Sequence, residues 1–250
     1  MRQERTLNER QEEILKIIAQ SHIQSATPVG SALVSDILGL SSATIRNVMG
    51  ELEDMKYISK PHTSAGRVPT SAGYRYYIDH LLEFGTISNQ QKRFIEKEYR
   101  DKDIGSIEIM LEKISHILSV MTNYAGMACT SDLKFYMEGT SNIADIPEFR
   151  NPQNMRRLLR LFDERTELLK ILNDDLTGNG VKIHIDEEDK SEALKDLSLI
   201  TGNYRIGSQD KGSLGVLGPM RMNYSILIPL VGFLSDAIEV LLDEMKIIDE

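Results

Sequence analysis

The chain has 250 residues, of which 41% are hydrophobic and 27% charged, enough for one large or two modest domains with a buried core. Its 38 acidic side chains outnumber its 29 basic ones, so a formal charge of −9 excludes a surface that attracts polyanions throughout, but not a local basic patch. The single cysteine, Cys129, excludes a disulfide framework and a zinc site built from several cysteines.

No segment of the sequence predicts a membrane span or an export signal. The longest apolar run, residues 224–234, is interrupted by Pro229 and Gly232. It is far shorter than the roughly 20 residues that cross a bilayer. The N-terminus lacks the apolar core of a secretion signal. We therefore predict a soluble protein of the cytoplasm that has no membrane partner.

The N-terminal residues predict a helix-turn-helix. Asn8 can cap a first helix, because Gln11 stands three residues later in the pattern of a capping box. A short helix over about 31–37 follows, Gly39 turns the chain, and Ser41 caps a third helix. Two helices joined by a tight turn that contains glycine are typical of this DNA-binding motif.

The third helix has an apolar face and a polar one. The apolar side chains that share one stripe at helical spacing are Ile45, Val48, Met49, Leu52 and Met55. The opposite face carries Ala43, Arg46, Asn47 and Gly50. In a major groove, arginine pairs with guanine, asparagine with adenine, and an alanine methyl contacts thymine, while glycine permits close approach. Ser42 and Thr44, at the helix N-terminus, can bind a phosphate.

Residues 57–69 predict a basic β-hairpin that follows this helix. Two short extended runs flank a turn of small residues that contains Gly66. Residues 56–76 carry four basic side chains and no carboxylate, although a loop that merely lacks acidic residues would look the same. Read as a wing, the hairpin places Arg67 in a minor groove and Lys60 and His62 on phosphates. The turn residues Thr63 and Ser64 complete the predicted DNA-binding set.

The remainder of the chain mixes helices with strands. The expected helices cover about 83–103, 104–121, 151–172, 191–196 and 225–245, and the expected strands cover 181–185, 199–206 and 214–219. This order predicts an α+β regulatory domain. We place a DNA-binding domain at 1–84, a helical connector at 85–103 and a regulatory and oligomerisation domain at 104–250.

The sequence lacks the motifs of an enzyme or a metal site. None of the five histidines stands at metal-ligand spacing, and neither a nucleophile elbow nor a P-loop occurs. The loose GxxGxxG at 212–218 is better explained by tight turns at a strand, and the four acids at 186–189 by a solvated turn. We predict no catalysis, no cofactor and no metal.

Several segments resemble the family of the heat-inducible transcription repressor HrcA. In the N-terminal part these are LNERQEEIL, TPVGSALVSD, LGLSSATIRNVMGELEDM and, most specifically, PHTSAGRVPTSAGYRYYIDHLL. In the C-terminal part they are YMEGTSNIADIPEF and GSLGVLGPMRMNYSILIPLV, which are similar to the family's GAF-like domain. The chain departs from the family pattern at Lys56, where the pattern has glycine. It also lacks a long central section, with an inserted dimerisation domain, between about Thr130 and Phe135.

The resemblance implies a repressor of heat-shock chaperone operons. Such a protein binds an inverted-repeat operator in double-stranded DNA as a homodimer, loses activity on heat stress, and is modulated by the chaperonin GroEL. The alternative is a one-component regulator whose GAF-like domain binds a small molecule and thereby changes the affinity for DNA.

Overall fold

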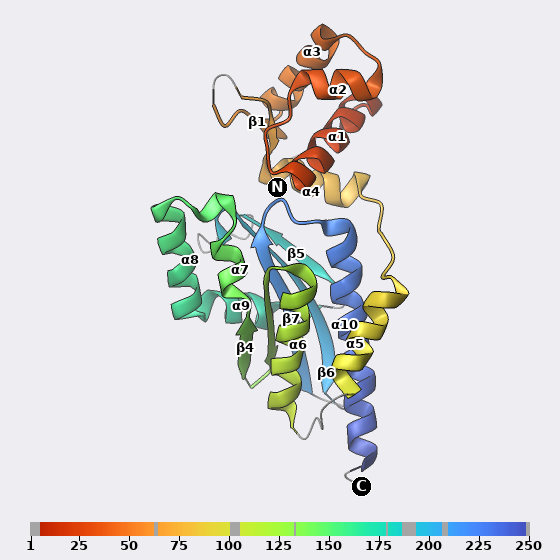
Figure 1. The fold of residues 1–250 in the computed structure, drawn as a ribbon, viewed down its shortest axis with the longest axis vertical. Helices are drawn as coiled ribbons and strands as arrows, with labels where there is room; N and C mark the ends of the chain where they lie inside the picture. The colour runs from red at the N-terminus through yellow and green to blue at the C-terminus, as the bar shows by residue number, and fades with distance from the viewer. Residues whose placement is uncertain are drawn as a thin grey trace. The chain divides into compact units, whose positions relative to one another are not determined.

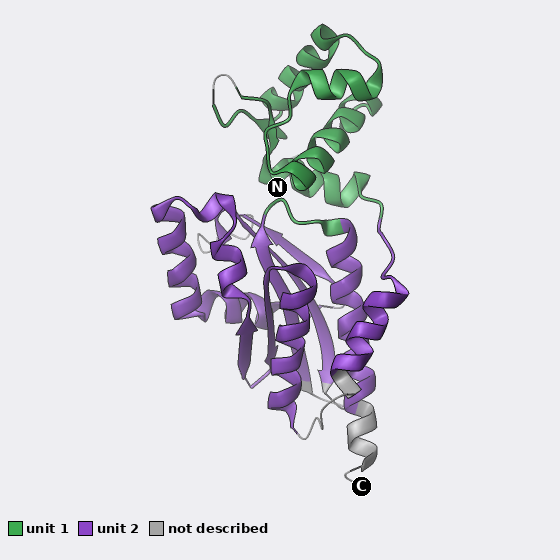
Figure 2. Cartoon of the chain, in the orientation of Figure 1, with its two compact units in different colours: residues 1–83, 220–224 green, residues 84–219, 225–250 purple. Residues whose placement is uncertain are grey.

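The computed structural model describes residues 6–62, 65–100, 106–132, 134–178, 180–186, 194–206 and 210–248 (Figure 1). The chain divides into two compact units, which Figure 2 shows in green and purple. Unit 1 consists of residues 1–83 with 220–224, and unit 2 of residues 84–219 with 225–250. Unit 1 contains the segment for which DNA binding is predicted.

Unit 1 is a winged helix. Its elements are α1 (Glu9–Ser25), α2 (Ser31–Leu38), α3 (Ser42–Asp54), the antiparallel strands β1 (Ile58–Ser59) and β2 (Val68–Pro69), α4 (Ser71–Tyr76) and the π-helical turn η1 (Tyr77–Leu81). The predicted caps are confirmed. Asn8 Oδ1 accepts a hydrogen bond from Gln11 N at 3.0 Å, and Ser41 Oγ accepts one from Thr44 N at 3.1 Å. These side chains satisfy amides that would otherwise lack partners in the first helical turn.

The predicted apolar stripe of α3 forms the centre of the core of unit 1. Ile45, Met49 and Leu52 are at most 3% exposed. They belong to one cluster with buried side chains of α1 and α2, which include Ile14, Leu15, Ile18 and Val34. Val48 and Met55 are half-buried at its edges. Because apolar burial fixes which side of α3 faces inward, it also fixes which side remains for a partner.

Lys56, which follows the C-cap Met55 of α3, has a left-handed backbone conformation with φ of 66°. A side chain with a Cβ atom adopts this conformation at a cost of about 1–2 kcal/mol, whereas glycine does so almost freely. Glycine, which the resemblance implies at this position, is thus the residue that the backbone geometry favours.

We therefore predict that Lys56→Gly raises the free energy of opening of α3 by about 1 kcal/mol. Native-state hydrogen exchange of the α3 amides in the full-length chain measures this quantity. Lys56→Ala is the matched control, because it removes the same side chain and keeps the Cβ. An equal gain in both variants would show that the lysine charge, rather than backbone strain, causes the effect.

Unit 2 is built on a five-stranded antiparallel sheet. Its strands, in the order β4-β3-β7-β6-β5, are β4 (Phe135–Glu138), β3 (Ala125–Thr130), β7 (Asp210–Pro219), β6 (Leu197–Ile206) and β5 (Lys182–Ile185). Its helices are α5 (Asn89–Arg100), α6 (Ile107–Thr122), α7 (Thr140–Ala144), the 3₁₀ turn η2 (Pro147–Phe149), α8 (Pro152–Glu164), α9 (Thr166–Asp175) and α10 (Tyr224–Ile248). A winged helix followed by a mixed domain of helices and sheet confirms the predicted fold class.

Helices cover both faces of this sheet (Figure 1). Ala125, Met127 and Cys129 point to the face that packs against buried side chains of α7, α8 and α9. Gly126, which points to the opposite face, lies against Ser115 and Leu118 of α6, and Gly202 of β6 lies against Ser235 and Val231 of α10. Because a Cβ atom at either glycine would overlap these neighbours, glycine lets both helices approach closely.

Some sequence predictions for unit 2 are wrong. One helix was expected over 151–172, but Arg165 takes a left-handed conformation with φ of 50° and separates α8 from α9. The strands β3 and β4 were not predicted, because β3 is buried at all six residues and has no alternating pattern. The short helix expected at 191–196 lies largely outside the described residues.

Helix α10 covers the helix that was expected over 225–245. Residues Tyr224–Leu242 are long and apolar enough to cross a membrane by length and composition alone, with a mean hydropathy of 1.9. In unit 2, Leu230, Val231 and Leu234 of this helix are buried. The core helix of a soluble protein meets the same criterion, so the finding is weak evidence for a membrane span.

A buried carboxylate joins α9 to the sheet. The side chain of Asp175, which is 3% exposed as a residue, accepts hydrogen bonds from His184 Nε2 at 2.8 Å and Thr201 Oγ1 at 2.5 Å. Lys182 Nζ lies 3.1 Å from the other carboxylate oxygen. Burial by itself raises the pKa of Asp175, but the hydrogen bonds from His184 and Thr201 outweigh it and hold the pKa below its ordinary value.

Candidate nucleic-acid interface

The predicted recognition face of α3 is accessible. Ala43, Thr44, Arg46 and Asn47 are exposed, and Ser42 and Gly50 are half-buried. Among the described residues, no heavy atom apart from the two chain neighbours and the backbone of the helix itself lies within 4 Å of the position that a Cβ on Gly50 would occupy. The structure therefore leaves open space beside this part of the helix, which a double helix could occupy.

The wing is attached to the loop between α1 and α2. Val29 N donates a hydrogen bond to Arg67 O, and Arg67 N donates one to Val29 O, both at 2.8 Å. Gly66 lies so close to the Val29 backbone that a Cβ there would overlap it. This pairing fixes the base of the hairpin, while Lys60 and His62 are exposed. Thr63 and Ser64 lie outside the described residues.

A cleft of about 380 Å³ brings predicted residues of α3 and the wing together. Arg46 of α3 and the wing residues Lys60 and Arg67 line it, together with Gly30 and Ser31 at the start of α2. The three basic side chains come from separate segments, but the fold places them around one cleft. Their combined positive charge contrasts with the net charge of −9 of the whole chain, and it suits a polyanion.

Arg67 does not project freely from the wing in this structure. Its Nη2 atom lies 2.8 Å from Glu53 Oε2, and its side chain is 15% exposed. Lys60 Nζ lies 3.9 Å from the same carboxylate oxygen. Glu53 was not among the residues predicted from the sequence; the signal was an acidic residue close in sequence to a basic hairpin.

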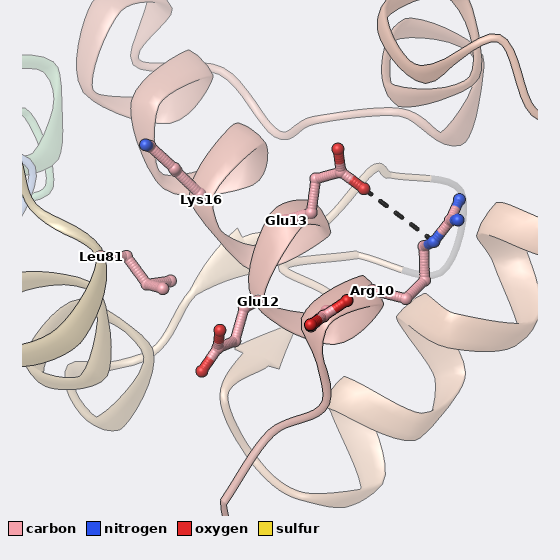
Figure 3. A pocket seen from close by; sticks show the side chains of 6 residues that line it. Arg10, Glu12, Glu13, Lys16 and Leu81 are labelled. Atoms are coloured by element: carbon pink, nitrogen blue, oxygen red, sulfur yellow. Dashed lines mark ion pairs between the residues drawn. The ribbon is translucent and has the colours of Figure 1, made fainter.

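A second hollow in unit 1, of about 480 Å³, has the opposite electrostatic character. It is lined by Glu9, Arg10, Glu12, Glu13, Lys16 and Leu81. Figure 3 shows the Arg10–Glu13 ion pair, which measures 3.9 Å. Three carboxylates against two cations make this surface unfavourable for a phosphate, so size alone does not identify the DNA site.

Two family models match nearly the whole chain. Residues 6–80 match the one described as "Winged helix-turn-helix transcription repressor, HrcA DNA-binding". Residues 86–228 match "HrcA protein C terminal domain", which by itself covers more than half of the chain.

Curated relatives match over the same extent. The heat-inducible transcription repressor HrcA of Geobacter sulfurreducens is 29% identical over 340 aligned positions, which cover 95% of this chain and 98% of the relative. The protein of that name from Oceanobacillus iheyensis is 29% identical over 339 positions, with 95% and 98% covered. The alignment with the Geobacter protein has 340 positions, but only 95% of this chain's 250 residues take part in it. About 100 of the aligned positions therefore have no counterpart in this chain.

A solved structure supports the fold. The crystal structure of a hypothetical protein at 2.2 Å resolution superposes with a TM-score of 0.73 at 18% identity, and covers 94% of this chain and 97% of that one. The architecture described above therefore occurs in an experimental structure.

Proposed function

Because the chain belongs to the HrcA family of heat-inducible transcription repressors, we propose that it represses transcription by binding an inverted-repeat operator as a homodimer. A winged-helix repressor binds DNA, and the exposed face of α3 and the wing supply the contacts. The observation that carries this proposal is the cleft that Arg46, Lys60 and Arg67 share in an otherwise acidic protein.

Each contact has a proposed role. Side chains on α3 read base edges in a major groove, while Lys60 and His62 bind phosphates and Arg67 reaches a minor groove after it leaves Glu53. The full set of proposed contacts is Ser42, Ala43, Thr44, Arg46, Asn47, Gly50, Lys60, His62, Thr63, Ser64 and Arg67. The two recognition helices of a dimer would set the spacing of the half-sites.

The remaining details follow the family. We propose that the operator controls chaperone genes, that heat inactivates the repressor, and that GroEL restores its active form in the cytoplasm. Residues 1–84 would form the DNA-binding domain, and 104–250 would form a GAF-like regulatory and oligomerisation domain. Residues 85–103 would be a helical connector between these two domains. We propose that the chain has no catalytic activity.

Fluorescence anisotropy with an inverted-repeat operator duplex and a scrambled duplex of equal length tests the proposal. We expect the operator to bind at least 1,000-fold more tightly, about the lower end for specific DNA-binding proteins, and sedimentation to show a dimer on the operator. Equal affinity for both duplexes would contradict sequence-specific repression.

The salt dependence of binding tests Lys60. Lys60→Ala should reduce the slope of log affinity against log salt by about one unit per subunit and leave the operator preference unchanged, because a phosphate contact releases a counterion. Lys16→Ala removes the same charge at the acidic hollow and should leave the slope unchanged. An unchanged slope in Lys60→Ala would remove this residue from the interface.

One observation favours small-molecule sensing as a second candidate. Unit 2 has a pocket of about 350 Å³ lined by polar side chains, which include Asn203, Lys211, Ser235 and Glu239. A metabolite that bound there would raise the melting temperature with the logarithm of its concentration. A thermal-shift screen in which no metabolite changes the melting temperature would argue against this candidate.

A further inference from the structure

Glu53 lies beside two basic side chains that a bound duplex would also attract. It lies in the last turn of α3, and its Oε2 atom is 2.8 Å from Arg67 Nη2 and 3.9 Å from Lys60 Nζ. Both basic residues also line the cleft between α3 and the wing. One carboxylate thus faces two of the three cations at this cleft.

The environment of Arg67 strengthens this competition. Its side chain is only 15% exposed, so solvent screens the ion pair less than it would screen a surface pair. Among the described residues, the buried Arg67 Nε atom has no hydrogen-bond partner. Glu53 therefore engages one edge of the guanidinium and leaves a donor unused, whereas a phosphate accepts several hydrogen bonds from arginine.

We propose that Glu53 is an intramolecular competitor of the DNA backbone that limits the affinity of this repressor for duplex DNA. Its carboxylate neutralises Arg67 and attracts Lys60 when DNA is absent, and the negative charge of a duplex must displace it before Arg67 can reach the minor groove. This inference rests on the proposed DNA-binding function. Because phosphates carry almost all non-specific binding, the competition acts on every sequence and limits binding away from the operator.

A second role for Glu53 predicts the opposite sign. If the carboxylate were only a brace that holds the wing against α3, its loss would loosen the wing and weaken binding. If it is a competitor, its loss frees a cation and strengthens binding. The direction of the change in affinity therefore separates the two roles.

The test is Glu53→Gln in the full-length protein, titrated by anisotropy on the operator and scrambled duplexes over a range of salt. Glutamine keeps the length of the side chain and an oxygen that can accept from Arg67, so the wing should remain in place. We expect affinity for the scrambled duplex to rise roughly tenfold at 0.1 M salt and the salt slope to steepen by about one unit per subunit, as one additional cation available to the duplex would produce. The preference for the operator should stay equal or fall.

Two further variants make the result specific. Asp54→Asn removes the same charge from the next residue of α3, which is exposed and has no ion-pair partner among the described residues; it should change affinity far less. In an Arg67→Gln background, Glu53→Gln should lose most of its gain in affinity for the duplex. The inference would be overturned if Glu53→Gln bound DNA no more tightly than the wild type, or if its gain in affinity equalled that of Asp54→Asn. A wild-type protein that binds neither duplex would instead overturn the proposed function.

Discussion

Replacing Asp175 with alanine is expected to lower the free energy of unfolding of unit 2 by about 3–5 kcal/mol, the usual loss when one partner of a buried charged group is removed. The carboxylate holds His184 and Thr201 by hydrogen bonds and lies 3.1 Å from Lys182 Nζ. Without it, these polar groups remain at the end of α9 without their common acceptor. Urea unfolding of the full-length chain, followed by hydrogen exchange of β5 and β6 amides, measures the loss.

The same carboxylate predicts how stability depends on pH. Because the pKa of folded Asp175 lies below its ordinary value, the folded state binds protons less readily than the unfolded chain. Its contribution is therefore complete above about pH 4 and is lost as the pH falls through the folded pKa. Asp175→Ala should lack this part of the acid dependence. Asp174→Ala, which removes an exposed carboxylate from the adjacent position, should retain it, and equal profiles for the two variants would contradict the assignment.

Arg46→Ala is expected to cost about 1–3 kcal/mol of binding to the operator and to relax the preference at one base pair in each half-site. Arg46 is exposed on α3 and lines the cleft beside the wing, where a guanidinium can pair with both acceptors of a guanine. Titrations against operators altered at single base pairs measure both effects.

Arg160→Ala is the matched control, since it removes an exposed arginine from α8 in unit 2. It should leave both the affinity and the preference unchanged. If Arg46→Ala weakened all duplexes equally, Arg46 would contact a phosphate and the assignment of the α3 face would be wrong.

Local signals in the sequence predicted unit 1 well. Asn8 and Ser41 each cap a helix, as expected, because a cap depends on a side chain and an amide three residues away. The buried stripe of α3 follows from helical spacing alone. These features need no information from distant parts of the chain.

The features that were missed depend on distant residues. Arg165 separates α8 from α9 in a left-handed conformation that usually takes glycine or asparagine, so its residue type gives no signal. Strand β3 is recognisable only from its pairing with β4 and β7. The contact between Glu53 and Arg67 requires the wing to fold back on α3, which no local pattern specifies.

The sheet is continuous across the position where the missing section was expected. The missing section was expected between Thr130 and Phe135, which lie in β3 and β4. These two strands pair antiparallel from Gly126 with Glu138 to Cys129 with Phe135. About 100 positions of the Geobacter relative have no counterpart in this chain. The five-stranded sheet therefore does not need them.

Protection of a single introduced thiol by DNA tests most directly whether α3 lies against a duplex. The natural Cys129 is 2% exposed, and burial raises its pKa to about 11, so a thiol reagent at neutral pH should not modify it. Ala43→Cys would place a reactive thiol on the exposed face of α3, and Glu13→Cys would place one at the acidic hollow. We expect the operator to block labelling of Ala43→Cys and to leave Glu13→Cys reactive. Equal labelling of Ala43→Cys with and without saturating operator, while anisotropy shows the complex, would contradict the account.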